Sequence, residues 1–270
     1  MMTTGNVQNL KIADTRYGIT IKSSREIGLM RQSASVLARS LETLIDAIKP
    51  GMTTKECDKI AERAIRNQGA TPAFKGYRGF PASLCISVND EIVHGIPSDR
   101  VLLDGDIVSI DLGAIVEGYY SDSALTLPVG TPGEVGQKLI DVGAEALRAG
   151  IAQALIGKKI GDISESIETV VKSYNLQVVR EYVGHGIGQQ LHEEPSVPNY
   201  KMPSKGPTLR PGMVLAIEPM VVAGNWKTTV MDDDWTVVTA DGKLSSHFEH
   251  TVAITENGPE ILTLRASEPA

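Results

Sequence analysis

The chain has 270 residues and a formal net charge of −7, with 41% hydrophobic and 22% charged residues, the balance of an ordinary soluble globular protein. The acidic balance argues against a nucleic-acid surface over the whole molecule, and no membrane contact is expected because the sequence lacks a signal peptide and any apolar run of about eighteen residues. Two cysteines, Cys57 and Cys85, are too few for a disulfide framework or a cysteine-based zinc module, so a reducing, cytoplasmic compartment is expected.

The first predicted elements are two helices, which follow an N-terminal extension of residues 1–22. Apolar residues recur every three or four positions from residue 23 to 48, which is the pattern of an amphipathic helix. Ser23 and Glu26 have the spacing of a capping box at its start. A second helix, opened by a capping box of Thr53 with Glu56, is predicted over residues 53–69.

Strands and carboxylates follow in the first half. The segment "LLDGDIVSID" (102–111) is a turn with glycine, a short apolar strand and then Asp111. The segment "SDSALTLPVG" (121–130) begins with Asp122 and runs as a strand to a glycine. Upstream of both, "VHGIP" carries His94.

The second half repeats this order. A helix is predicted over residues 133–155 and a shorter one, opened by Asp162 with Glu165, over 162–174. "GHGIG" (184–188) shares a His-Gly-Ile core with the earlier "VHGIP", and its glycines favour a strand edge or loop over a helix. "LRPGMVLAIE" (209–218) aligns with the earlier strand segment (102–111) without a gap, and "FEHTVAITENG" again begins with an acid.

The duplication predicts the fold class. Helices followed by antiparallel strands, present twice, indicate an α+β fold with pseudo-twofold symmetry, in which strands of both halves converge on the axis and helices cover one face. We expect a single domain over residues 23–262, with halves of about 23–130 and 131–262, and a C-terminal tail of 263–270.

Each half supplies one histidine and two carboxylates in the same order. Asp111 and Glu218 directly follow apolar runs, at the ends of strands that should be buried, where an isolated carboxylate is very costly. Lysine or arginine partners are the structural alternative, but the repeated signature carries histidine and further acids instead. Several acids facing one another repel unless they are protonated or bind cations, so a pair of divalent metals such as Mn, Fe, Co or Zn is expected. Such a centre favours hydrolysis of an amide or ester, and the spacing alone leaves open which histidine is the ligand.

These residues and their motifs resemble a known family. "CISVNDEIVHGIP", "IDLGAIVEGYYSDSA", "GHGIG", "LHEEP", "AIEP" and "FEHT" stand in the order and spacing of the type I methionine aminopeptidases, of the M24 or pita-bread family. The resemblance covers about residues 23–262. The short interval between His192 and Glu218 leaves no room for the helical insert of the type II enzymes.

The resemblance implies a pita-bread fold, a curved antiparallel sheet covered by helices, and a two-metal site. By that resemblance Asp122 and Glu249 would bridge two divalent ions (Co, Mn, Fe, Zn or Ni). Asp111 would bind one ion, and His185 with Glu218 would complete the other.

The resemblance also implies a reaction, the removal of initiator methionine from nascent proteins whose second residue is small. Glu218 would accept the proton of the attacking water, and His192 would hydrogen-bond the substrate carbonyl as it becomes an oxyanion. His94 would lie near the scissile nitrogen.

A methionine pocket is implied as well, since a thioether packs well against aromatic edges and other soft atoms. At the family's positions for its walls stand Tyr77, Phe80, Cys85 and Trp235. Phe74 replaces a common cysteine and Leu191 a common phenylalanine, which changes the shape of the pocket. Plain core packing is the alternative for each aromatic residue.

Further expectations concern partners. The family pattern implies a monovalent cation near Ser245, a transient contact with the ribosome, and a monomer. Two other functions remain open from the residues: a proline-directed peptidase of the same fold, or a non-catalytic peptide-binding module. Neither His247 nor His250 matches a family ligand; along a strand His247 would share the face of Glu249, two residues away, and His250 would point to the opposite face. The three consecutive acids of "MDDDW" (231–235) are expected to form a solvated loop and not a metal site.

Overall fold

The computed structural model describes residues 13–14 and 17–268. Its helices are α1 (Ser24–Ala47), α2 (Thr54–Arg66), α3 (Glu134–Ala152) and α4 (Ile160–Ser173), with a 3-10 turn, η1, at Tyr77–Gly79. The four helices expected from the sequence are therefore confirmed, with ends that differ by a few residues.

The strands are β1 (Ala13–Asp14), β2 (Ile19–Thr20), β3 (Thr71–Pro72), β4 (Leu84–Val88), β5 (Glu91–Val93), β6 (Ile107–Val116), β7 (Tyr119–Pro128), β8 (Gln177–Val178), β9 (Gly184–Gly186), β10 (Glu193–Val197), β11 (Val214–Ile217), β12 (Met220–Val222), β13 (Thr228–Val230), β14 (Val237–Thr239), β15 (Ser245–His247), β16 (Glu249–Thr255) and β17 (Gly258–Ile261).

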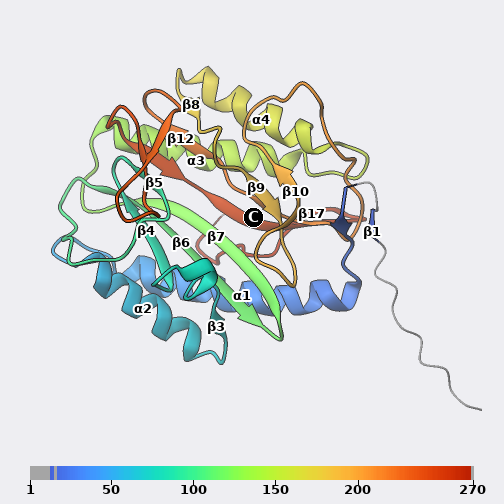
Figure 1. Cartoon of the computed structure of the whole chain (residues 1–270), viewed down its shortest axis with the longest axis horizontal. Coiled ribbons are helices and arrows are strands. Elements are labelled where there is room, and N and C mark those ends of the chain that lie inside the picture. Colours follow the sequence, from blue (N-terminus) through green and yellow to red (C-terminus); the bar gives the residue numbers. More distant parts are fainter. Residues whose placement is uncertain (1–12, 15–16, 269–270) are drawn as a thin grey trace, which may run out of the picture.

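One large antiparallel sheet organises the molecule. Its order is β10-β9-β11-β16-β7-β6-β3, with β17 beside β16 and β4 beside β6. Smaller sheets, β15-β12-β8 and β13-β14-β5, flank it. In Figure 1 the helices α1 and α2 lie below the long strands β6 and β7, and α3 and α4 lie above them. The expected α+β fold with a curved antiparallel sheet is confirmed.

The two halves repeat within this sheet. Strands β6 and β11 begin at Ile107 and Val214, two positions that the gapless alignment of the two sequence segments makes equivalent. The halves meet where β7 pairs with β16, with Glu249 opposite Ala124. One detail was wrong: Asp111 lies in the middle of β6, which continues to Val116, whereas Glu218 does directly follow the end of β11.

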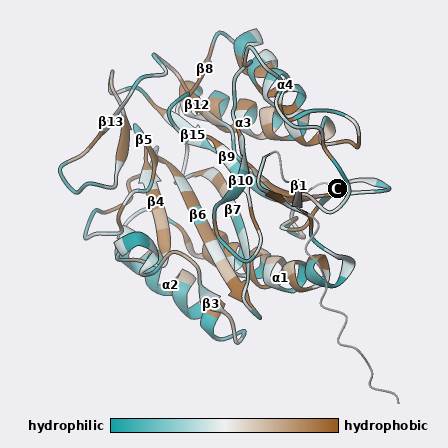
Figure 2. Cartoon of the chain, turned by 45° about the vertical axis from the view of Figure 1, so that its right-hand side comes forward, coloured by the Kyte–Doolittle hydropathy of each residue, from teal (hydrophilic) through white to brown (hydrophobic). Residues whose placement is uncertain are grey.

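Apolar faces of the helices form the core. Helix α1 packs on α2, β6 and β7, and helix α3 packs on α4 and on strands of the second half. Leu37, Leu41 and Leu44 of α1 are fully buried, and burial of each stabilises the fold by about 1.5–3 kcal/mol relative to an exposed position. Figure 2 shows the same division, with hydrophobic colour along β4 and β6 and hydrophilic colour along the outer sides of α1 and α2.

The helix starts follow the capping signals in the first half. Both expected capping boxes form, at Ser23 with Glu26 and at Thr53 with Glu56. The expectation that α4 begins at Asp162 was wrong. Its N-cap is Lys159, and Asp162 is the third helical residue, whose carboxylate accepts a hydrogen bond of 2.8 Å from the Lys159 amide. Asp162 therefore occupies the third helical position of the capping box, which we had expected Glu165 to occupy.

The C-terminal segment up to residue 268 packs against the central strands. His250 of β16 contacts Thr263 through a hydrogen bond of 2.9 Å at Nδ1. Arg265 is only 4% exposed and donates a hydrogen bond to Glu268. Since side chains alternate along a strand, the contact between His250 and Thr263 lies on the face of β16 opposite to the one that carries Glu249.

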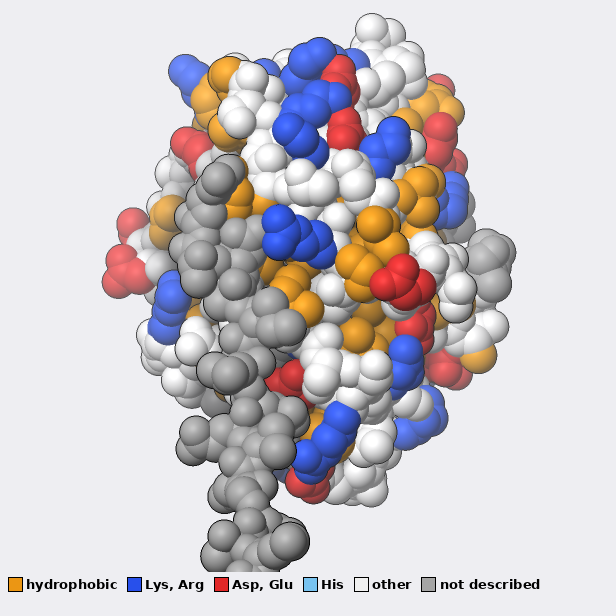
Figure 3. Space-filling view, turned by 90° about the vertical axis from the view of Figure 1, so that its right-hand side faces the viewer, with side chains coloured by type: hydrophobic (Ala, Val, Ile, Leu, Met, Phe, Trp, Pro, Cys, Tyr) orange, Lys and Arg blue, Asp and Glu red, His pale blue; other side chains and the backbone are white. Residues whose placement is uncertain are grey.

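The surface is mixed in charge. Figure 3 shows a face on which lysine, arginine and acidic side chains are interspersed among hydrophobic ones. Within the described residues, no helix combines the length and apolarity that a membrane crossing requires.

Candidate metal centre and active site

Five acidic and histidine side chains from five parts of the sheet line one cavity of about 160 Å³. They are Asp111 (β6), Asp122 (β7), His185 (β9), Glu218 (after β11) and Glu249 (β16). All five candidate metal-binding residues are thus brought together from both halves of the chain.

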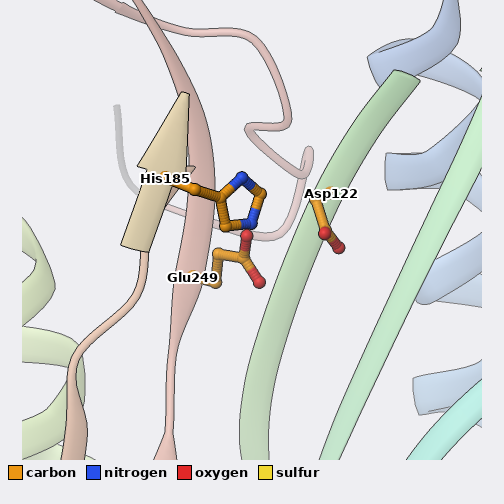
Figure 4. Close-up of side chains that lie close together, drawn as sticks. All are labelled: Asp122, His185 and Glu249. Carbon is orange, nitrogen blue, oxygen red and sulfur yellow. The ribbon is translucent and has the colours of Figure 1, made fainter. Parts of the chain in front are cut away.

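Three of the five form a tight group. Asp122, His185 and Glu249 each offer one ligand atom, and these atoms all lie within 4.8 Å of one another. Figure 4 shows the imidazole of His185 beside the carboxylate of Glu249, with Asp122 on the neighbouring strand β7. An Asp, a Glu and a His in this arrangement are suitable ligands for a divalent transition metal.

Glycines allow the strand that carries His185 to approach its neighbours. A Cβ on Gly184 would lie 2.4 Å from the backbone oxygen of Ala216, and one on Gly186 would lie 2.2 Å from that of Glu194. The expected strand or loop in place of a helix is a strand, β9, but it lies between β10 and β11 and not at an edge of the sheet; the glycines serve close contact between these strands. His185 Nδ1 lies 2.9 Å from the Gly186 carbonyl, which can only accept, so Nδ1 carries the proton and Nε2 is free to bind a metal.

Hydrogen bonds across the β7–β16 seam fix the two acids of the tight group. The Asp122 amide donates to Thr251 Oγ1 over 3.0 Å, and the same hydroxyl donates to the Asp122 carbonyl over 2.8 Å. The Ser123 hydroxyl donates to the Glu249 carbonyl over 2.8 Å. The backbone of both acids is therefore held from the opposite strand.

The electrostatics of the cluster call for a cation. Burial raises the pKa of Asp111 to about 6 and that of Glu218 to about 8. Burial and the neighbouring acids raise the pKa values of Asp122 and Glu249 well above the usual range. One buried oxygen of Asp111, of Asp122 and of Glu249 also lacks a hydrogen-bond partner among the described residues. A divalent ion would satisfy both the charge and the unpaired oxygens, so these residues fit such an ion.

The histidines of the cavity are neutral. Burial lowers the pKa of His185 to about 3 and that of His94 to about 4. Neutral imidazole is the form that binds metals, or that donates one hydrogen bond and accepts another. His94 follows β5 with φ of 60°, a left-handed conformation, and its ring lies edge-on to Trp235.

His192 lies at the mouth of the cavity. Its ring centroid is 4.3 Å from that of His185, and its Nδ1 is 2.8 Å from the Tyr77 hydroxyl. If the tyrosine donates this hydrogen bond, the proton of the imidazole resides on Nε2, which then can donate. Burial lowers the pKa of His192 as well.

The four candidate pocket residues line the apolar side of the same cavity. The rings of Phe80 and Trp235 meet edge to face at 5.1 Å, and Cys85 of β4 pairs with Asp111 in the ladder. Phe74 and Leu191 are buried and line the cavity too. An apolar wall therefore adjoins the acidic cluster.

One residue that the sequence left unassigned also belongs to this region. His247 lies two residues before Glu249, is 2% exposed, and has its Nε2 3.6 Å from Glu218 Oε2. The sequence predicted that it shares a face with Glu249 but gave it no role, and the two residues lie in successive strands, β15 and β16. His250 points away from the cluster, as expected, towards Thr263.

Other expectations also have an outcome in the structure. The acidic residues Asp232, Asp233 and Asp234 are exposed, as expected for a solvated loop. Ser245 is buried, and its hydroxyl donates to the carbonyls of Asn89 (3.2 Å) and Glu91 (3.0 Å).

Comparisons with known proteins agree with this geometry. The sequence model of metallopeptidase family M24 matches residues 28–256. Methionine aminopeptidase 1 of Bacillus subtilis (strain 168) is 55% identical over 245 residues, which are 91% of this chain and 99% of that protein. The crystal structure of methionine aminopeptidase from Rickettsia prowazekii superposes with a TM-score of 0.89 at 40% identity, covering 91% of this chain and 100% of that one. Prolidase from Pyrococcus furiosus gives a TM-score of 0.74 at 26% identity, covering 92% of this chain but 66% of that one.

Proposed function

The chain belongs to metallopeptidase family M24, and we propose that it is a methionine aminopeptidase that removes the N-terminal initiator methionine from proteins whose second residue is small. The observation that carries this proposal is a cavity with an acidic, histidine-bearing end and an apolar, aromatic end. Relatives named methionine aminopeptidase that are 55% and 52% identical over 91% of the chain support it.

The five clustered residues are proposed to hold two divalent ions, with Asp122 and Glu249 shared between them. Asp111 would bind one ion, and His185 with Glu218 would complete the other. When bound, such ions lower the pKa of an attacking water to about 7 and polarise the scissile carbonyl. Among Co, Mn, Fe, Zn and Ni, the oxygen and nitrogen ligands alone do not select one.

The protein's own groups would move the protons. Glu218, ionised by the ions that it would help to bind, would accept the proton of the attacking water and pass it to the leaving amine. His192, oriented by the Tyr77 hydroxyl, donates from Nε2 to the carbonyl oxygen as negative charge develops there. His94, which lines the same cavity, would lie near the scissile nitrogen.

Selectivity for methionine would come from the apolar wall. Tyr77, Phe80, Cys85 and Trp235 supply aromatic edges and a polarisable sulfur atom, which suit a thioether side chain. Leu191 and Phe74 complete this wall, and we assign to them the shape of the pocket. A bulky second residue would collide with the rim of the metal site, so small second residues are preferred.

Further assignments remain proposals. We propose a monovalent cation beside Ser245, where the carbonyls of Asn89 and Glu91 already converge. A single catalytic domain over residues 23–262, a monomeric state, a cytoplasmic location and a transient ribosome contact complete the proposal.

The experiment compares peptides that differ in their first two residues. The protein, supplied with Co²⁺ or Mn²⁺, should release methionine from Met-Ala-Ser much faster than from Met-Leu-Ser, and it should leave Ala-Pro-Ser intact. Equal rates on the two methionine peptides would contradict the proposed rim. Cleavage of Ala-Pro-Ser alone would favour the proline-directed alternative, and metal binding without any cleavage would favour a non-catalytic module.

A further inference from the structure

His247 is a buried histidine in contact with the metal-binding cluster that the proposed mechanism does not use. It ends β15, where it pairs with Met220 of β12, and it is 2% exposed. The hydroxyl of Thr126 holds the backbone of His247 through two hydrogen bonds. The His247 amide donates to Thr126 Oγ1 over 2.8 Å, and the Thr126 hydroxyl donates to the His247 carbonyl over 3.0 Å. The ring is therefore attached to a rigid part of the sheet.

Neither ring nitrogen of His247 has a hydrogen-bond partner among the described residues. A buried polar atom without a partner costs about 1–3 kcal/mol, so such a residue in a core calls for an explanation. An imidazole carries at least one N–H group, so His247 can donate a hydrogen bond to a neighbouring acceptor. The groups that face it belong to the cluster and its surroundings: Asp111, Glu218 and His94.

The Glu218 carboxylate lies between two imidazoles. Its Oε1 is 3.6 Å from His185 Nε2, and its Oε2 is 3.6 Å from His247 Nε2. The backbone of Glu218 is tied by the Asn199 amide group, which donates to its carbonyl over 2.9 Å. That bond leaves the three side-chain torsions of the glutamate free, so the direction of its carboxylate depends on what holds its oxygens.

We propose that His247 is a positioning residue for Glu218, whose Oε2 accepts a hydrogen bond from His247 Nε2–H. This bond holds the carboxylate so that Oε1 faces His185 and the metal-binding cluster. It requires a shortening of the 3.6 Å separation by about 0.6 Å, which one side-chain rotation supplies. Partners that orient metal-binding side chains in this way affect metal affinity by about 10–100-fold when they are removed.

The inference rests on the proposed function only for the role of Glu218 in proton transfer, because the effect on metal affinity can be measured separately. Three variants of the full chain test it. His247→Leu introduces an apolar side chain of similar size and removes the N–H donor. His247→Gln supplies a side-chain N–H donor of similar reach. His250→Gln is the matched control, because His250 is an equally buried histidine nearby that faces Thr263 on the other side of the sheet.

The first measurement is the dissociation constant of Co²⁺ for metal-stripped protein by calorimetry, with near-ultraviolet circular dichroism to verify folding. His247→Leu should bind Co²⁺ about 10-fold more weakly, with most of the affinity regained in His247→Gln. His250→Gln should bind Co²⁺ like the wild type. A folded His247→Leu with wild-type affinity, or a His247→Gln as weak as His247→Leu, would overturn the proposal.

The second measurement separates kcat from KM on Met-Ala-Ser at saturating metal. Loss of Glu218 orientation should lower kcat about 10-fold and leave KM unchanged, because the methionine pocket lies elsewhere in the cavity. An unchanged kcat in His247→Leu would contradict the positioning role. If the wild type released no methionine, the proposed function would fail, while the Co²⁺ affinities would still decide whether His247 positions Glu218.

Discussion

Replacement of Thr251 by valine removes the hydroxyl that holds Asp122 and keeps the shape of the side chain. Thr251 is fully buried, and its hydroxyl both accepts from the Asp122 amide and donates to the Asp122 carbonyl. Both groups would lose their partner within the seam between β7 and β16. An unpaired buried polar group costs about 1–3 kcal/mol, so the loss of both partners should lower the free energy of unfolding by about 2–6 kcal/mol.

The same substitution should also weaken metal binding. The Asp122 backbone would shift relative to Glu249, and the tight group depends on both acids. We expect the dissociation constant for Co²⁺ to rise about 10-fold or more.

Thr255 of the same strand provides a matched control. Its hydroxyl also makes two hydrogen bonds, accepting from the Asn257 amide (3.2 Å) and donating to the Gly258 carbonyl (2.7 Å), but at the far end of β16 where water can replace it. Thr255→Val should therefore cost less stability and leave Co²⁺ affinity unchanged. Urea unfolding of the metal-free proteins and calorimetric titration with Co²⁺ measure the two effects. A Thr251→Val protein that loses less than about 0.5 kcal/mol, or that binds Co²⁺ as tightly as the wild type, would refute this reasoning.

Three further predictions concern the same cavity. Because burial raises the pKa of Glu218 from 4.5 to about 8, the folded metal-free protein retains a proton that the unfolded chain loses. The free energy of unfolding should therefore fall from about pH 5 to pH 8, by about 1.4 kcal/mol per pH unit for such a group. Urea unfolding at several pH values, in EDTA and in saturating Mn²⁺, measures this dependence. Gly184→Ala should lower Tm, since the new Cβ would lie 2.4 Å from a carbonyl oxygen of β11. Gly28→Ala in α1 should raise Tm slightly, because nothing lies within 4 Å of its new Cβ and alanine favours a helix. The opposite order of the two Tm values would contradict the close approach of the strands. His192→Ala should lower kcat about 100-fold with little change in KM, and an unchanged kcat would remove it from the mechanism.

The sequence predicted those parts of the fold that local pattern controls. The period of apolar residues indicated the helices, and the gapless alignment of residues 102–111 with 209–218 indicated the duplicated strands. It misplaced Asp111 at a strand end, because the acid interrupts an apolar run that β6 resumes at Leu112 and continues to Val116. It also misplaced the start of α4, where Lys159 rather than Asp162 is the N-cap.

The candidate site was predictable to a similar degree. Acids at repeated positions pointed to one cluster, and the structure brings all five residues to one cavity. Distances between strands that are distant in the chain were not predictable, and neither was the contact of His247 with Glu218, which depends on how β15 lies beside the end of β11. The two hydrogen bonds of Thr251 across the seam likewise depend on tertiary register.

The central claim is that the clustered acids and His185 hold divalent metal that the hydrolysis of an N-terminal methionine requires. The most direct test is to titrate metal-stripped protein with Co²⁺ or Mn²⁺ under anaerobic conditions and to follow bound metal and methionine release from Met-Ala-Ser in the same samples, for the wild type and for Asp122→Asn. We predict that release by the wild type rises with bound metal and is abolished by EDTA, and that Asp122→Asn binds less metal and releases little methionine. Release that persists in the metal-free wild type, or an Asp122→Asn protein that binds metal and cleaves like the wild type, would contradict the account.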